Sequence, residues 1–196
     1  GGVVAANRPE TRLIGSVGKP GLYQDIVIRD EDGRKLPNGE TGAIETTSAQ
    51  AAYGYLLEDG TVDRIRGRAL MTGDLGYLDG DGFLHITGRA KDVINRGGVN
   101  IAPLEIDQVL AGHPDVAEAA AIGIADTVYG EEVAALVVLR PGAEPDAEAI
   151  RGHCAQTLPE AKVPKRILFT KALARNARSK IDRGALLEMW QRDSHD

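Results

Sequence analysis

The sequence predicts an α+β protein, with a small antiparallel β unit in its first half and mixed helices and strands in its second. In the first half, strand-like segments alternate with turns rich in Gly, Asp and Asn. In the second half, some segments repeat apolar residues at helical spacing and others are continuous apolar runs. The 196 residues suffice for one large domain or two small ones. We place the boundary near residues 88–92, where the β unit ends at Gly88 and Arg89.

Strands and tight turns account for the first half. Residues 22–29 are strand-like, and the turn sequence Asp-Glu-Asp-Gly at 30–33 follows them. A second strand is expected over residues 43–47, after the turn signals at 37–42. Residues 76–87 alternate between apolar and polar around the sequence Asp-Gly-Asp-Gly, which predicts a β-hairpin.

Helices and apolar strands account for the second half. Pro103 suits the first turn of a helix, and His113-Pro114 marks the end of that helix. Ala147, Ile150, Cys154 and Leu158 recur at the spacing of a second helix. The remaining expected elements are strands at 116–124, 133–139 and 167–169 and a last helix at about 182–190.

Composition excludes several classes of protein. No run of about 18 apolar residues is present, so no transmembrane segment is expected. No signal-peptide pattern opens the chain. The single cysteine, Cys154, excludes an intrachain disulfide and is compatible with the cytoplasmic location that we expect. The net charge of −6 argues against nucleic acid as a partner.

Positive charge is concentrated near the end of this acidic chain. Residues 162–183 contain eight Lys and Arg side chains and one Asp, and eight minus one gives +7. Such a stretch is either a solvated face or a site for an anionic ligand such as a phosphate, and the sequence leaves both open. Lys180 lies in it, and a lysine is a compact charge suited to a phosphate oxygen.

Two segments look like known ligand loops but lack their spacing. Residues 15–21 (Gly-Ser-Val-Gly-Lys-Pro-Gly) differ from GxxxxGK[ST], and Pro20 stands where Ser or Thr is needed. Residues 79–82 begin like a calcium loop, but its sixth position is Leu84 and its twelfth is Ala90. The four histidines show no HExxH pattern, so no metal site is predicted in this chain.

Two further segments are candidates for ligand contact. Asp74 follows Gly73 at the end of an apolar strand, where a carboxylate can accept two hydrogen bonds from a diol such as ribose. Residues 88–98 combine three basic side chains with the pair Gly97-Gly98, which allows close approach to the backbone. A turn aspartate and a charged linker are the competing interpretations of these two segments.

Together these motifs resemble, in order, the C-terminal part of the adenylate-forming (AMP-binding) enzymes, of the acyl-CoA synthetase type. The resemblance extends from about Gly15 to Leu187 and includes Thr72-Gly73-Asp74-Leu75, Gly82 to Arg89, Lys91-Asp92 to Gly97-Gly98, Ile101 to Ile106, Asp126 to Glu131 and Asn176 to Lys180. It implies that 1–89 is the barrel-like β subdomain that closes the family's large AMP-binding domain. It also implies that 90–196 is the family's mobile α+β lid domain.

The resemblance implies a role for each matching residue. Asp74 would bind the ribose hydroxyls of ATP or AMP, and Arg89 would lie beside the nucleotide. Lys91 would be the hinge of the small domain, where many members have Asp. Gly98 would line the tunnel for the pantetheine thiol, and Lys180 would be the catalytic lysine of the first half-reaction.

The implied chemistry has two steps. A carboxylic acid substrate attacks the α-phosphate of Mg-ATP to give acyl-AMP, and a thiol then displaces AMP. The Mg²⁺ ligands are expected in the family's N-terminal part, which these residues lack. We expect CoA to be the thiol; the alternative is the phosphopantetheine of a carrier protein, loaded by an aryl-acid ligase.

The sequence also departs from the family pattern. Ser179 replaces the usual Gly before the catalytic lysine, and Ala174 replaces a common Pro. The family's Ser/Thr/Gly-rich phosphate loop is absent, so we expect the isolated chain to be inactive and its parent to be the ligase. If this chain is the whole protein, a non-catalytic binding module or a structural interaction domain is expected instead.

Overall fold

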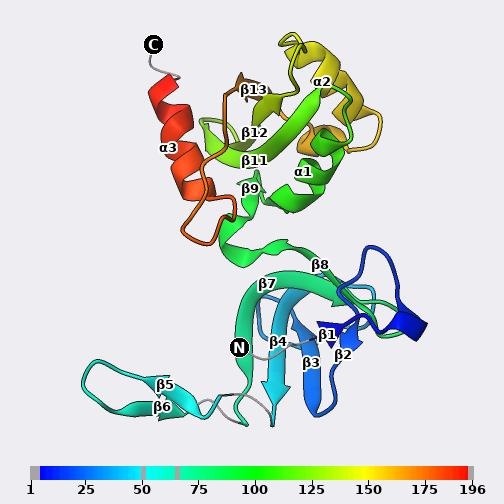
Figure 1. Cartoon of the computed structure of the whole chain (residues 1–196), viewed down its shortest axis with the longest axis vertical. Helices are drawn as coiled ribbons and strands as arrows, with labels where there is room; N and C mark the ends of the chain where they lie inside the picture. Colours follow the sequence, from blue (N-terminus) through cyan, green and yellow to red (C-terminus); the bar gives the residue numbers. More distant parts are fainter. Residues whose placement is uncertain (1–4, 50–51, 65–66, 194–196) are drawn as a thin grey trace. The chain divides into compact units, whose positions relative to one another are not determined.

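Helices and strands occur together in this chain, as the sequence predicts (Figure 1). The computed structural model describes residues 5–49, 52–64 and 67–193. The chain divides into two compact units, Gly1–Lys91 and Asp92–Asp196. Strands dominate the first unit, and helices pack against a sheet in the second.

A four-stranded antiparallel sheet forms the framework of the first unit. Its strands, in spatial order, are β3 (Gln24–Arg29), β4 (Gly42–Ser48), β7 (Leu70–Leu78) and β8 (Leu84–Arg89). Ile26, Ile28, Ile44 and Leu84 form its buried core. The strands expected at 22–29 and 43–47 and the hairpin at 76–87 are thereby confirmed.

This sheet is open and forms no closed barrel among the described residues, so the barrel-like form expected for the subdomain is not confirmed. Among the described residues, its edge strands β3 and β8 do not pair with each other. The free edge of β8 is covered locally instead: Val17 N donates to the Leu84 carbonyl at 2.9 Å, and Leu84 N donates to the Gly18 carbonyl at 2.8 Å. A strand edge that is already paired in this way has fewer groups left to close a barrel.

Short elements complete the first unit. They are the pair β1 (Ala5–Ala6) and β2 (Lys19–Pro20), the pair β5 (Gly54–Leu56) and β6 (Val62–Arg64), and the 3₁₀ turns η1 (Pro9–Thr11) and η2 (Ala90–Asp92). Residues 15–21 therefore contribute an edge contact and a short strand rather than the start of a helix. This agrees with the rejection of a nucleotide-triphosphate loop there.

The turn between β7 and β8 is organised by Asp79. Its carboxylate accepts hydrogen bonds from the backbone N–H groups of Asp81 at 3.0 Å and Phe83 at 2.9 Å. The His85 ring nitrogen lies 2.9 Å from the other carboxylate oxygen, and the same ring stacks on Tyr77. The bond to His85 and the backbone bonds lower the pKa of Asp79. The carboxylate is thus used inside the hairpin, as expected for a turn rather than a calcium loop.

The Asp79 carboxylate makes stability depend on pH. A lowered pKa in the folded state adds stability above the unfolded value of about 3.9 and loses it as pH falls through the folded value. We therefore expect Asp79→Asn to be less stable than the wild type at pH 7, with the difference shrinking by pH 3. Urea unfolding followed by circular dichroism measures this. Asp81→Asn, an exposed neighbour, is the control, and an unchanged difference at pH 3 contradicts the assignment.

A mixed sheet forms the second unit. Its strands run in the order β10 (Val99–Ile101), β9 (Ile94–Arg96), β12 (Gly130–Leu139) and β11 (Val116–Asp126), and β13 (Arg166–Phe169) pairs in parallel with β12. Its helices are α1 (Pro103–Ala111), α2 (Ala147–Ala155) and α3 (Arg183–Asp193), with a 3₁₀ turn η3 (Glu160–Lys162).

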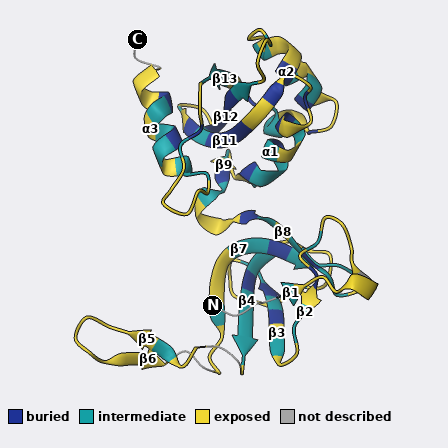
Figure 2. Cartoon of the chain, viewed as in Figure 1, coloured by how far each residue is buried: buried dark blue, intermediate teal, exposed yellow. Residues whose placement is uncertain are grey.

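Both faces of the central strands are covered, which explains their unbroken apolar sequence. Ile106 of α1 and Ile150 of α2 pack with Val133 and Ala135 on one face. Leu186 and Trp190 of α3 pack with Leu136 and neighbouring residues on the other. Figure 2 shows these strands as the dark, buried centre of the unit. The strands and helices expected for this half are confirmed.

The helix boundaries follow local sequence signals. Pro103 opens α1, and Gly112 follows its last residue. The side chain of Asp146 caps α2 by accepting a hydrogen bond from Ala149 N at 2.9 Å. The helix ends at Ala155, and Leu158 continues its apolar face because its N–H still donates to the Cys154 carbonyl.

Candidate functional site

The first unit brings Asp74 and Arg89 together. They are direct partners across β7 and β8, and Arg89 Nε lies 3.2 Å from Asp74 Oδ1. The Asp74 side chain remains 30% exposed and the Arg89 side chain 49% exposed, so both can reach a ligand. Thr72 Oγ1 accepts from Asp74 N at 3.1 Å and donates to the Ile44 carbonyl, which fixes the bend before Asp74. Asp74 lies within β7 rather than at the strand end expected from the sequence, and Arg89 is the last residue of β8. A carboxylate and a guanidinium placed side by side in this way can bind hydroxyl and phosphate oxygens.

Lys91 is the last residue of the first unit. It is exposed and lies in the single 3₁₀ turn η2, between the end of β8 and the start of β9. A short, largely exposed turn at a unit boundary is the kind of element that can absorb a change in backbone angles.

A tight turn joins β9 to β10 in the second unit and carries Gly97 and Gly98. Their φ angles are 57° and 86°, in the left-handed region that favours glycine. Gly98 N donates to Asn95 Oδ1 at 3.0 Å. A Cβ placed on Gly98 would meet no atom within 4 Å, so one side of this turn is open.

Lys180 lies at the end of a small loop held by Asn176. Asn176 Oδ1 accepts from Arg178 N at 2.9 Å and from Lys180 N at 3.2 Å, and Asn176 N donates to the Lys180 carbonyl at 2.8 Å. Ser179 has a φ of 59°. Glycine adopts this angle without strain, which explains why a Gly suits this position. Ser179 adopts the same left-handed angle with a side chain, at a cost in backbone strain. The Lys180 side chain is exposed.

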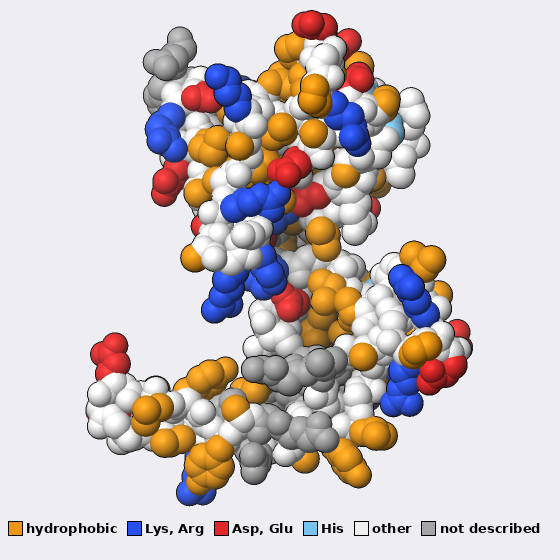
Figure 3. Space-filling view, viewed as in Figure 1, with side chains coloured by type: hydrophobic (Ala, Val, Ile, Leu, Met, Phe, Trp, Pro, Cys, Tyr) orange, Lys and Arg blue, Asp and Glu red, His pale blue; other side chains and the backbone are white. Residues whose placement is uncertain are grey.

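The positive stretch at 162–183 divides between structural and exposed charges. Three of its side chains form ion pairs: Lys162 with Glu105, Arg175 with Glu118, and Arg183 with Asp107. Arg178 and Lys180 are exposed on the loop before α3. Figure 3 shows Lys and Arg side chains (blue) gathered at the end of this unit that carries the loop.

Sequence reasoning missed the ion-pair network of Arg183. Its guanidinium bonds Asp107 of α1, lies 3.8 Å from Asp92, and donates from Nε to the Ala121 carbonyl at 3.1 Å. Asp107 in turn accepts from Ala121 N at 2.7 Å, and burial raises the pKa of Asp107 even though Arg183 faces it. Arg183 therefore fixes the start of α3, which directly follows the Lys180 loop, to the residue after Lys91.

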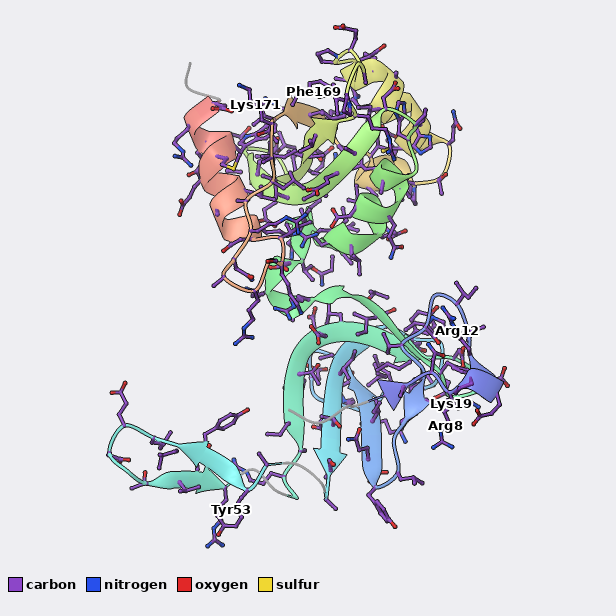
Figure 4. The ribbon with its side chains drawn as sticks, in the orientation of Figure 1. Arg8, Arg12, Lys19, Tyr53, Phe169 and Lys171 are labelled. Atoms are coloured by element: carbon purple, nitrogen blue, oxygen red, sulfur yellow. The ribbon has the colours of Figure 1, made fainter. Side chains whose placement is uncertain are left out.

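Lys19 of the first unit makes a contact of a different kind. Lys19 lies on β2 (labelled in Figure 4), and its ammonium is 4.6 Å from the centre of the Phe83 ring. The Lys19 ammonium is thus held in a cation–π contact. Within residues 5–49, 52–64 and 67–193, no group of three or more His, Cys, Asp or Glu side chains could hold a metal ion. None of the helices in that part of the chain could span a bilayer.

Residues 105–180 match the family described as the AMP-binding enzyme C-terminal domain. The chain is 43% identical over 182 residues to a sulfoacetate–CoA ligase of Cupriavidus necator, with 91% of this chain and 35% of the relative covered. It is 40% identical over 186 residues to a 2-succinylbenzoate–CoA ligase of Geobacillus kaustophilus, with 93% and 38% covered. The chain thus spans about a third of the length of these relatives.

Solved structures agree with these matches. An o-succinylbenzoate CoA synthetase of Bacillus subtilis, in complex with its acyl-adenylate intermediate, has a TM-score of 0.83 and 34% identity, with 93% of this chain and 38% of that chain covered. An anthranilate CoA ligase in complex with anthranoyl-AMP has a TM-score of 0.83 and 32% identity, with 95% and 37% covered. This chain belongs to the adenylate-forming (AMP-binding) enzymes and corresponds to their C-terminal part.

Proposed function

We propose that this chain is the C-terminal part of an ATP-dependent acyl-CoA synthetase, which activates a carboxylate as acyl-AMP and transfers the acyl group to CoA. The main support is similarity over 91% and 93% of the chain to two proteins named as CoA ligases. Residues 1–89 complete the large AMP-binding domain, and 90–196 are the mobile lid. The two compact units, divided after Lys91, support this assignment.

The first half-reaction joins two anions. A carboxylate oxygen attacks the α-phosphorus of ATP, the bond from that phosphorus to the bridging oxygen breaks, and pyrophosphate leaves. Asp74 binds the ribose hydroxyls, and Arg89, 3.2 Å from it, orients that carboxylate and faces the nucleotide. Lys180 supplies positive charge to the oxygens on which negative charge accumulates. When bound with ATP, Mg²⁺ neutralises phosphate charge, and its ligands belong to other parts of the protein.

The second half-reaction needs a different face of the lid. The thiol of CoA loses its proton to solvent, its sulfur attacks the acyl carbon, and the bond from that carbon to the AMP oxygen breaks. Lys180 is no longer required once pyrophosphate has left. Rotation of the backbone at Lys91 exchanges the Lys180 loop for the Gly97–Gly98 turn, whose open side admits the pantetheine arm.

Addition of CoA is expected to accelerate AMP release by the full-length protein. Acyl-AMP is held tightly until a thiol acceptor arrives, so turnover without CoA stays slow. The measurement is AMP formation with ATP, Mg²⁺ and a panel of carboxylic acids, with and without CoA. If CoA has no effect and a holo carrier protein accepts the acyl group instead, the protein is an aryl-acid or carrier-protein-loading ligase.

The 196-residue chain alone is proposed to be inactive. It spans about a third of its relatives, and the phosphate loop of the family lies outside its sequence. Carboxylate-dependent exchange of pyrophosphate into ATP is therefore expected from the full-length protein and absent from this chain. Nucleotide binding without exchange in both proteins would favour a non-catalytic binding module, and exchange by the chain alone would contradict its inactivity.

A further inference from the structure

The turn that carries Gly97 and Gly98 is supported from behind by residues of the β11–β12 loop and of β12. We propose that Glu132, Arg96 and Tyr129, the turn clamp, position this turn for attack by the CoA thiol. The proposal rests on the function proposed above and adds positioning residues for its second half-reaction. All three residues belong to the second unit.

The first contact of the turn clamp is a two-point ion pair. Arg96 Nε lies 2.6 Å from Glu132 Oε1, and Arg96 Nη2 lies 3.0 Å from Glu132 Oε2. The Glu132 side chain is 8% exposed and that of Arg96 is 18% exposed. The bonds to Arg96 lower the pKa of Glu132, so the carboxylate is charged at neutral pH. A forked pair of this kind fixes both the position and the plane of the guanidinium immediately before Gly97.

The second contact comes from Tyr129. Its ring lies under the Arg96 guanidinium, with 4.0 Å between Cζ and the ring centre. Its carbonyl accepts a hydrogen bond from Gly97 N at 2.9 Å. A Cβ on Gly97 would lie 3.1 Å from Tyr129 Cδ1, so the ring also limits the space behind the turn. Tyr129 thus holds Gly97 through its ring and its backbone together.

The loop that carries Tyr129 is itself fixed. Asp126 Oδ1 accepts from Val128 N at 2.8 Å and from Tyr129 N at 2.9 Å, and these bonds lower the pKa of Asp126. Glu131 Oε2 accepts from Asn95 N at 2.6 Å, and Asn95 Oδ1 accepts from Gly98 N. The turn is therefore tied to the β11–β12 loop on its inner side, whereas Gly98 has open space on the other side.

Burying an ion pair costs free energy, which indicates that the turn clamp positions the turn rather than stabilising the fold. Replacing a buried ion pair with well-packed apolar residues is often neutral or stabilising, so the pair is weak support for stability alone. What it provides here is a fixed direction for two glycines, whose backbone is intrinsically adaptable. A displacement of about 1 Å in a reacting group can cost about 100-fold in rate, so such fixation matters for thiol attack.

Two substitutions test the turn clamp in the full-length protein. Glu132→Gln removes the charge of the ion pair, and Tyr129→Ala removes the ring while keeping the carbonyl. Both are expected to lower CoA-dependent thioester formation by about tenfold or more and to leave carboxylate-dependent exchange of pyrophosphate into ATP within about twofold of wild type. The KM for CoA should rise, and the KM for the carboxylate should not.

Glu105→Gln is the matched control, because it removes the Lys162–Glu105 ion pair of the same unit, whose N···O distance is also 2.6 Å. It should change neither half-reaction. Equal losses of both half-reactions in Glu132→Gln, or normal thioester formation in both turn-clamp variants, would overturn the proposal.

Hydrogen exchange separates this proposal from the proposed function. The Gly97 and Gly98 amides should exchange at least about tenfold faster in Glu132→Gln than in Glu105→Gln or wild type. This readout needs no substrate. If the wild type performs no adenylation, the proposed function fails while the exchange data still decide the turn clamp, and equal exchange rates at both glycines would refute it.

Discussion

Replacing Lys180 with Ala in the full-length protein is expected to reduce acyl-AMP formation by about 100-fold to 1,000-fold, the cost of removing one preorganised electrostatic contact. The first half-reaction brings a carboxylate against a triphosphate, so the loss of a cation directly raises its barrier. Asn176 holds the loop through backbone groups, at 2.8 Å to the Lys180 carbonyl. The substitution therefore removes the charge and leaves the loop in place.

The two half-reactions distinguish this role from a general positive surface. Pyrophosphate exchange measures the first, and thioester formation from preformed acyl-AMP and CoA measures the second, which should stay close to the wild-type rate. Lys171→Ala is the matched control, because Lys171 is an exposed cation of the same stretch, just beyond Phe169 at the end of β13 (Figure 4). Similar small effects of both variants would favour a docking face that does not depend on one lysine.

Replacing Arg183 with Met is expected to destabilise the second unit by about 3–5 kcal/mol, because it leaves Asp107 buried without its cation. The Asp107 side chain is only 12% exposed, and its pKa is already raised by burial. Without Arg183 that pKa rises further. A raised pKa in the folded state makes stability greatest below the unfolded value and lost as pH rises through the folded value, so the defect should be largest at neutral pH and smaller near pH 4.

Trp190 allows the unfolding of the second unit to be measured separately. It is the single tryptophan of the chain and packs in the α3 core, so its fluorescence in urea follows the second unit. Arg175→Met, which breaks the half-exposed pair with Glu118, should cost about 1 kcal/mol or less. A pH-independent defect in Arg183→Met, or one no larger than that of Arg175→Met, would show that Asp107 is not left as an uncompensated charge.

Local pattern was enough to predict most elements of this fold. The apolar runs at 116–124 and 133–139 became the two long buried strands, because a strand covered on both faces needs apolar side chains at every position. Pro103 fixed the start of α1 through its own backbone angle. Asp74, Arg89, Gly98 and Lys180 could be singled out because their motifs depend on residue type and order along the chain.

Contacts between distant segments could not be predicted in this way. Arg183 and Asp107 are 76 positions apart, and Arg96 and Glu132 are 36 apart, so nothing in local periodicity links them. The contact of Val17 and Gly18 with the edge of β8 is likewise long-range, since it joins segments about 66 positions apart. A sequence determines which residues each strand or helix buries. Which charges then meet depends on strand register and helix packing. These decided the ion pairs next to the Lys180 loop and the Gly97–Gly98 turn.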